Sequence, residues 1–165
     1  MMTKSERMWS CERIRRADLA DAQSIRQIHR RSVETLCRED YTKEQIQAWT
    51  MPPDSRLLES SVVEDDTWVA TCRGVVCGFG SRVRSEVVAL YVDPASVRRG
   101  VGRALLAQLE NLIANDGMHR ITLASTLTAE KFYQAHGYVA VAHDIHLLRS
   151  GISVPIVSMQ KDLGS

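Results

Sequence analysis

One stretch constrains the fold more than any other part of the sequence, EVVALYVDPASVRRGVGRALLAQLENLI. Residues 86–92 form an almost continuous apolar run rich in β-branched side chains, which is typical of a central strand buried on both faces. Residues 101–113 repeat apolar side chains at helical spacing. Two of only nine glycines, Gly100 and Gly102, lie where this helix is expected to begin. The stretch therefore predicts a strand, a glycine-containing loop and a helix that packs on the sheet.

The segments around this stretch interleave short strand-like runs with amphipathic helical patterns. Such interleaving predicts an α/β fold with a mixed sheet and helices on both faces. The expected strands are 10–15, 68–72, 75–83, 86–92, 119–125, 138–145 and 153–163, and the expected helices are 19–37, 42–50, 101–113 and 128–135.

Capping residues indicate where three of these helices begin or end. Asp18 or Asp21 can cap the first helix. Thr42 is expected to cap the second helix, with Gln45 completing a capping box. Gly117 is placed to end the helix that follows the glycine pair.

Length and composition fit one soluble domain. A chain of 165 residues can bury a hydrophobic core, and it contains no repeat, low-complexity tract or linker. We therefore expect one domain over 10–163, preceded by a flexible segment at 1–9. The N-terminus has no signal-peptide pattern, and no apolar run approaches the roughly 20 residues that cross a bilayer. We expect a cytoplasmic protein without a membrane partner.

Charge and cysteine content argue against two other classes. The net charge of +1 lacks the basic excess of a general nucleic-acid binder. The four cysteines form no CxxC pair and have no histidine at zinc-site spacing, so we expect buried, reduced thiols and no metal. They are Cys11, Cys37, Cys72 and Cys77.

The glycine pair predicts a phosphate-binding loop at a helix start. The first amides of a helix lack intrahelical acceptors and carry partial positive charge, and glycine lets the backbone approach an anion. Arg98, Arg99 and Arg103 add positive charge beside the pair. The pattern fits neither a Walker A loop nor a dinucleotide-binding fingerprint. A plain loop-to-helix turn on a solvated basic surface is the alternative.

Two motifs together resemble the GNAT superfamily of acetyl-CoA-dependent N-acetyltransferases. EVVALYVDPASVRRGVGRALL resembles its strand, (Q/R)xxGxG loop and helix, and AEKFYQAHGYV resembles its second signature, a short helix followed by a strand. The resemblance implies the GNAT fold, a mostly antiparallel sheet, along nearly the whole chain. Val97 departs from the pattern, since it stands where the family has Gln or Arg.

The resemblance also implies a binding site for acetyl-CoA. The backbone of the central strand would pair with the pantetheine arm, and the loop would bind the pyrophosphate. Side chains after the fifth strand would touch the coenzyme. The residues implied are Leu90, Tyr91, Val92, Arg98, Arg99, Gly100, Val101, Gly102, Arg103, Ser125 and Thr126.

Acetyl transfer needs a neutral amine, a stabilised carbonyl oxygen and a proton for the departing thiolate. Tyr133 matches the family tyrosine near the sulfur and is the candidate general acid; the alternative is a packing role. Glu86 matches a position where several GNAT enzymes carry a basic glutamate; the alternative is a solvated strand-start residue. A carboxylate serves as base here only if it is desolvated or acts through water. Four histidines, His119, His136, His143 and His146, are candidates by residue type alone.

The expected acceptor is the primary amine of a small molecule, attacking directly in a ternary complex. By resemblance, the first two helices would cover its pocket, with Tyr41, Trp49 and Trp68 as partial lining or, alternatively, as core. Two other functions stay open: acetylation of a protein lysine or N-terminus, and a non-catalytic CoA-binding regulatory module. The resemblance also implies a bacterial origin and a homodimer.

Overall fold

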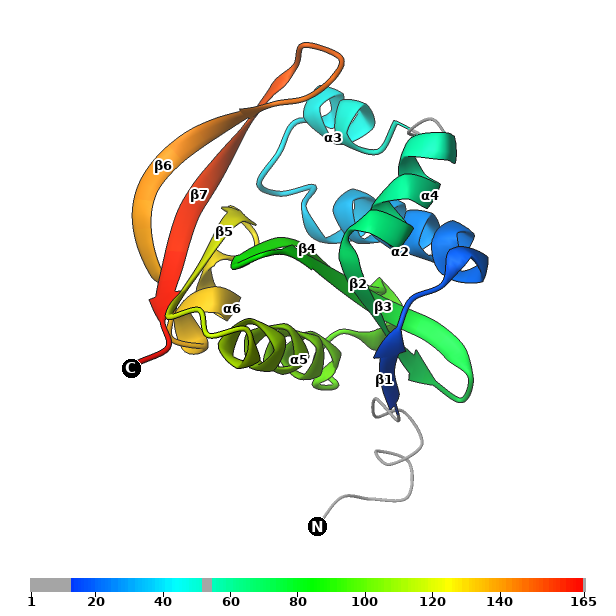
Figure 1. Ribbon diagram of the computed structural model, residues 1–165. Helices are drawn as coiled ribbons and strands as arrows, with labels where there is room; N and C mark the ends of the chain where they lie inside the picture. Colours follow the sequence, from blue (N-terminus) through cyan, green and yellow to red (C-terminus); the bar gives the residue numbers. More distant parts are fainter. Residues whose placement is uncertain (1–12, 52–54, 165) are drawn as a thin grey trace.

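The computed structural model describes residues 13–51 and 55–164, and within these ranges the strands form one sheet (Figure 1). Its order is β1-β2-β3-β4-β5-β7-β6. All neighbouring strands run antiparallel except β4 and β5, which run parallel, so the expected mixed, mostly antiparallel sheet is confirmed. The strands are β1 Arg13–Arg16, β2 Asp66–Cys72, β3 Val75–Val83, β4 Glu86–Val92, β5 Arg120–Thr126, β6 Val139–Leu147 and β7 Ser153–Asp162.

Helices cover both faces of the sheet, as expected for this α/β fold (Figure 1). Phe79 of β3 packs with Ile25 and Ile28 on one face, whereas a Cβ at Gly80 would point to Leu109 on the other, 3.0 Å away. In Figure 1, α2, α3 and α4 lie above the sheet and α5 lies below it. The helices are α2 Ala22–Leu36, α3 Lys43–Trp49, α4 Ser55–Glu64, α5 Val101–Asn115 and α6 Glu130–Ala135, with short 3-10 helices η1 Leu19–Asp21 and η2 Pro94–Ser96.

Helix α4 was not expected from the sequence. Its segment, SRLLESSVVE, contains serines and β-branched valines, which have low helix propensity. Leu58 and Val62 pack against the core beneath α2, so tertiary packing supports a helix that local propensity does not predict. Two other expectations fall on residues outside the described ranges: the flexible segment 1–9 and the start of the first strand at 10–12.

The predicted caps are confirmed. Thr42 and Gln45 form the capping box of α3, and the Asp18 carboxylate caps η1 by accepting the N–H of Ala20. Gly117 follows α5 with φ +80°. Its N–H donates to Ala114 O, and the next N–H donates to Ile113 O, which together make a Schellman motif.

The prediction that β4 is buried on both faces is wrong. Val87 is 4% exposed, but Val88 is 43% exposed, Glu86 is also exposed, and residues 89–92 are only half-buried. The reason is the pairing: β4 meets β5 at two positions only, Glu86↔Thr122 and Val87↔Leu123. Beyond them the strands part, and β4 has an open edge in the middle of the sheet.

Each of the two strands remains paired on its other side. β5 pairs with β7 along its whole length, and β4 pairs with β3 up to Val92↔Gly78. A register shift between Ser81 and Arg82 bends the β3–β4 ladder near the point where β4 leaves β5. The opening therefore lies between two well-paired half-sheets, β1-β2-β3-β4 on one side and β5-β7-β6 on the other.

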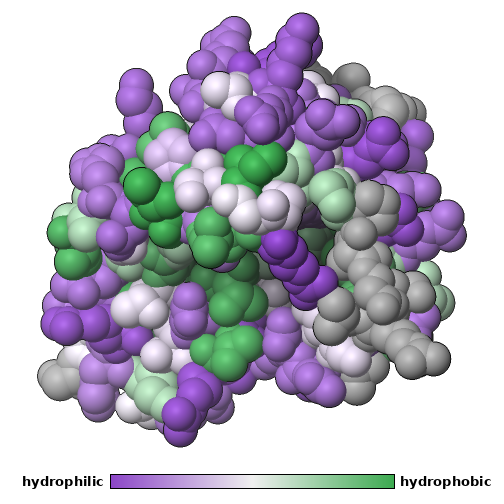
Figure 2. Space-filling model, turned by 90° about the horizontal axis from the view of Figure 1, so that it is seen from above, coloured by the Kyte–Doolittle hydropathy of each residue, from purple (hydrophilic) through white to green (hydrophobic). Residues whose placement is uncertain are grey.

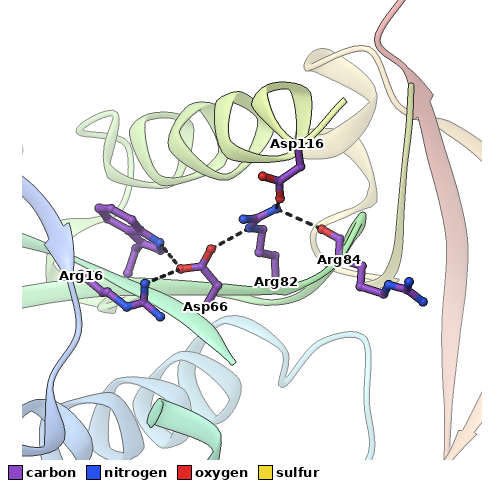
Figure 3. Close-up of polar contacts among 6 residues, drawn as sticks. Arg16, Asp66, Arg82, Arg84 and Asp116 are labelled. Carbon is purple, nitrogen blue, oxygen red and sulfur yellow. Dashed lines mark hydrogen bonds and ion pairs between the residues drawn. The ribbon is translucent and has the colours of Figure 1, made fainter. Parts of the chain in front are cut away.

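Arg82 fastens the C-terminal end of α5 to the sheet (Figure 3). Its guanidinium donates to Asp66 on β2 at 2.8 Å and to Asp116 after α5 at 2.6 Å. Asp66 also accepts the indole N–H of Trp68 at 2.7 Å. A carboxylate at a helix C-terminus is disfavoured by the helix dipole, and Arg82 offsets that charge.

We expect Arg82→Met to lower the free energy of unfolding by about 2 kcal/mol, because it leaves two carboxylates without their shared, largely buried partner. Urea unfolding at pH 7 measures the change. Arg120→Met is the matched control, since its ion pair with Asp162 is exposed on both sides and such pairs contribute roughly 0–1 kcal/mol. Equal losses in the two variants would contradict the anchoring role.

Candidate active site

The parting of β4 and β5 leaves a cavity of about 260 Å³. Residues 87–92 of β4 line it along one side, and Ala124 and Thr126 of β5 line the other. The N-terminal turn of α5 and the α6 side chains Phe132 and Tyr133 also line it, and so do Ser32, Leu36 and Cys37 at the C-terminal end of α2. Figure 2 views the molecule from the top of Figure 1, and hydrophobic side chains gather there in a hollowed centre ringed by hydrophilic ones. The cavity is mostly apolar.

Backbone groups of β4 face this cavity. In a strand, the N–H and C=O groups of alternate residues point to opposite sides. The N–H of Asp93 donates to Cys77 O on β3 at 2.8 Å, so the groups of Leu90 and Val92 point the other way, toward β5. Past Val87 that side has no ladder with β5, and these groups can pair with a ligand.

The start of α5 presents free amides beside the same cavity. Gly100 is the N-cap with φ +80°, and no side chain caps the helix. The N–H of Ala104 is the first to find an intrahelical acceptor, Gly100 O at 3.0 Å. The amides of Val101, Gly102 and Arg103 precede it, so they are available to an anion.

Glycine is required at positions 100 and 102 for different structural reasons. Gly100 needs glycine for its left-handed backbone, whereas Gly102 is helical. A Cβ at Gly102 would lie 3.4 Å from the Phe132 ring and 3.5 Å from Val92, so a longer side chain would enter the cavity.

Exposed Arg98, with φ +63°, lies in the same loop, and Arg99 and Arg103 are also exposed. Val97, where the family has Gln or Arg, contributes an apolar wall to the cavity.

Tyr133 lies at the inner wall of the cavity. Its side chain is nearly buried, and its ring meets those of Phe132 and Tyr138 edge to face. None of the described residues hydrogen-bonds its hydroxyl. Because no buried side-chain oxygen of the described residues lacks a hydrogen-bond partner, this hydroxyl must be accessible, and it faces the cavity. Burial, with a smaller effect of Tyr91, raises the pKa of this phenol far above its ordinary value. The phenol therefore holds its proton at neutral pH.

Two predicted residues lie apart from this group. Glu86 is exposed at the paired end of β4 and is not among the residues that line the cavity. Ser125 is buried, and its hydroxyl donates to Thr126 O at 2.7 Å. Thr126 does line the cavity, and its hydroxyl accepts the N–H of Ala129 at the start of α6.

The aromatic residues considered for the acceptor pocket pack in the core. The Tyr41 hydroxyl donates to Pro155 O at 2.7 Å and accepts the N–H of Leu127 at 2.9 Å, so its polar group is occupied. Trp49 packs on Tyr41. Trp68 packs under α5 with its indole bonded to Asp66.

His29 was missed by the sequence analysis. It lies on α2, and its ring contacts Tyr91 of β4 edge to face at 4.7 Å between centroids. Burial lowers the pKa of its imidazole to about 4. His29 follows Ile25 by four residues, so the helical stripe that predicts the buried face of α2 also places His29 toward the sheet. From this spacing the sequence could have predicted that His29 faces the sheet.

The described residues contain neither a candidate metal-binding cluster nor a helix suited to crossing a membrane. No group of three or more His, Cys, Asp or Glu side chains in these ranges could hold a metal. None of the helices described combines the length and hydropathy needed to cross a bilayer. Cys37, Cys72 and Cys77 form no disulfide with one another; Cys37 and Cys77 are buried and Cys72 is half-buried, and Cys11 lies outside the described ranges.

Comparison with known proteins adds a family match. Residues 37–163 match the model of the acetyltransferase (GNAT) domain. The chain is 32% identical over 128 residues to the uncharacterized N-acetyltransferase YafP of Escherichia coli K12, covering 78% of this chain and 81% of that protein.

Solved structures show the same arrangement. A GCN5-related N-acetyltransferase from Rhodopseudomonas palustris is 29% identical, with a TM-score of 0.91 over 99% of both chains. A phosphinothricin acetyltransferase from Sinorhizobium meliloti, solved in complex with acetyl-CoA, is 22% identical with a TM-score of 0.69 over 92% of this chain and 88% of that chain. The second likeness concerns the fold alone.

The low pKa of His29 predicts a pH dependence of stability. The unfolded imidazole, near 6.5, binds a proton more tightly than the folded one, near 4. Stability from His29 is therefore complete above pH 6.5 and is lost as the pH falls toward 4. We expect wild type to lose about 1–2 kcal/mol more than His29→Gln between pH 7 and pH 5 in urea unfolding. Equal losses, or an NMR titration midpoint near 6.5, would contradict the buried environment.

Proposed function

The chain belongs to the GNAT family of acetyltransferases, and we propose that it transfers an acetyl group from acetyl-CoA to the primary amine of a small molecule. The observation that carries the proposal is the junction of two features. The edge of β4 opens beyond Val87, and that open edge leads directly to the uncapped start of α5. A ligand with an extended amide-containing arm and an anionic end matches both.

The residues present fit acetyl-CoA. The free amides at the start of α5 and the exposed Arg98, Arg99 and Arg103 suit a pyrophosphate. The outward-facing groups of Leu90 and Val92 suit the amides of a pantetheine arm, which would add to β4 as a strand does. The space beside Gly102 would be filled by any larger side chain. Binding by backbone amides also explains how Val97 can replace the family's polar residue.

Acetyl-CoA supplies an acetyl group activated as a thioester. In the transfer, the amine nitrogen bonds to the acetyl carbon, the C–S bond breaks, the amine gives up one proton and the sulfur takes one. In the proposed transfer, an N–H of β4 near Val92 would polarise the carbonyl oxygen. Tyr133 would donate the proton to the sulfur. Its raised pKa makes it a protonated hydrogen-bond donor throughout the physiological range.

The group that accepts the proton of the amine is less directly placed. Glu86 stays our predicted base, and its exposed position requires a relay through water. His29 lies nearer to the centre of β4 and is neutral at pH 7, so it can accept a hydrogen bond from the amine. The expected homodimer stays a prediction.

We expect Gly102→Glu to weaken acetyl-CoA binding by about 100-fold or more, because it places a negative side chain in the space proposed for the coenzyme. Isothermal titration with acetyl-CoA measures the effect. Ala107→Glu is the matched control, since it adds the same charge at an exposed position of α5 away from the cavity. Folded wild-type protein that does not bind acetyl-CoA would overturn the proposed function.

We expect Tyr133→Phe to lower kcat by about 100-fold without changing the affinity for acetyl-CoA, because it removes the proton donor and keeps the ring. Stability should be unchanged, since no described residue bonds the hydroxyl. Steady-state kinetics with an accepted amine, together with isothermal titration, separate the two effects. Unaltered turnover in Tyr133→Phe would exclude Tyr133 as the general acid.

Glu86→Gln in the same assay tests the proposed base. Unaltered kcat/KM across pH 6–9 would exclude Glu86.

A further inference from the structure

A second cavity, of about 610 Å³, lies between α2 and α3, and its charge is strongly one-sided. We call it the basic groove. Arg26, Arg30 and Arg38 line it from α2 and the turn after it, and Lys43 lines it from α3. Glu34 is the single acidic group among its lining residues, and His29 lies at its inner end.

The positive charge of the groove is only partly neutralised within the protein. Glu34 is bonded to Arg30 at 2.9 Å. Arg26, Arg38 and Lys43 form no ion pair with any residue that the structure describes. The residues at 26, 30 and 34 recur every fourth position and so lie along one side of α2, and Arg38 follows in the turn after the helix. In a chain of net charge +1, this is a marked local excess of cations.

A third cavity, of about 250 Å³, shares lining residues both with the basic groove and with the proposed acetyl-transfer site. Arg26 and His29 line both the groove and this third cavity. Val88, Ala89 and Tyr91 line both the third cavity and the opening between β4 and β5. The shared residues make the three cavities neighbours, so an acceptor that occupied the third cavity would reach from Arg26 to the centre of β4.

The third cavity borders the cationic basic groove at Arg26 and the proposed reaction site at β4. Its walls are mainly apolar, from Ile25, Leu58 and Phe79, with the hydroxyls of Thr67 and Ser81 among them. An acceptor bound here would place a hydrocarbon portion against these walls. Its amine would lie near β4 and its other end near Arg26.

We propose that the acceptor is an amine that also carries an anionic group, a carboxylate or a phosphate, and that Arg26 binds this group while Arg38 and Lys43 attract it into the groove. The inference rests on the proposed acetyltransferase function and narrows its substrate class. A guanidinium binds carboxylate or phosphate through two parallel hydrogen bonds. Polycationic amines are disfavoured, because they would meet three cations without a counter-charge.

The neutral state of His29 is consistent with this arrangement. Of the titratable groups at the inner end of the groove, Arg26 is the cation and His29 is uncharged at pH 7. The anion is thus held by a permanent charge, and the amine passes an imidazole that does not repel it.

Matched pairs of amines test the proposal. Lysine against cadaverine, and 3-aminopropylphosphonate against 3-aminopropanol, differ by the presence of the anion. We expect the anionic member of a pair to show at least tenfold higher kcat/KM in a thiol-release assay with acetyl-CoA, and the preference to fall as salt rises. Whichever pair shows the larger preference identifies carboxylate or phosphate.

Variants assign the preference to the groove. Arg26→Gln should remove most of it, and Arg26→Glu should reverse it toward cadaverine, while the affinity for acetyl-CoA stays unchanged. Arg120→Gln, on the exposed side of β5, alters the net charge equally and should leave the preference intact. Retained preference in Arg26→Glu would overturn the proposal.

The outcomes separate this inference from the proposed function. Acetyl-CoA binding with equal turnover of both members of each pair would overturn the anionic acceptor and leave the acetyltransferase intact. Loss of acetyl-CoA binding by folded wild type would overturn both. Faster acetylation of a peptide with an acidic N-terminal sequence than of every free anionic amine would overturn the small-molecule class.

Discussion

The two-residue pairing between β4 and β5 is the constraint on which the site depends. Glu86↔Thr122 and Val87↔Leu123 hold the two half-sheets together, and the ladders to β3 and β7 commit each strand to its other neighbour. Further pairing would close the edge of β4, bury its backbone groups and remove the cavity. Less pairing would separate the half-sheets. An edge strand inside a sheet normally invites association with another chain; here helices on both faces restrict access, so a narrow ligand is the partner that fits.

Much of the fold could be predicted because its signals are local. The helical stripe of α5, the capping box at Thr42 and the Schellman glycine at position 117 each depend on residues within a few positions of one another. The loop at the start of α5 was predicted for the same reason. The sequence could not distinguish its two glycines. Backbone conformation explains Gly100, whereas the reason for Gly102 is the approach of Phe132 from a distant helix.

The features that sequence reasoning did not predict are those set by distant contacts. An apolar run favours burial on both faces, yet β4 lies half-open because of where β5 diverges, and no residue of β4 encodes that divergence. The charge of the groove depends on α3 lying beside α2. Within α2 the arginines look like an ordinary solvated surface, and only the neighbouring helix makes them converge. His29 could have been predicted from its spacing, but its environment depends on Tyr91.

The distribution of charge gives the proposed reaction a direction. Cations lie in the loop at the start of α5, at Arg98, Arg99 and Arg103, and in the basic groove, whereas the cavity between β4 and β5 is mostly apolar. An apolar centre strengthens every polar contact made within it and disfavours an ammonium ion. An amine held at one end by its anion would therefore favour its neutral form as its nitrogen reaches β4. Neutral nitrogen is the nucleophile, so the same low-polarity wall that raises the pKa of Tyr133 would also favour the reactive state of the acceptor.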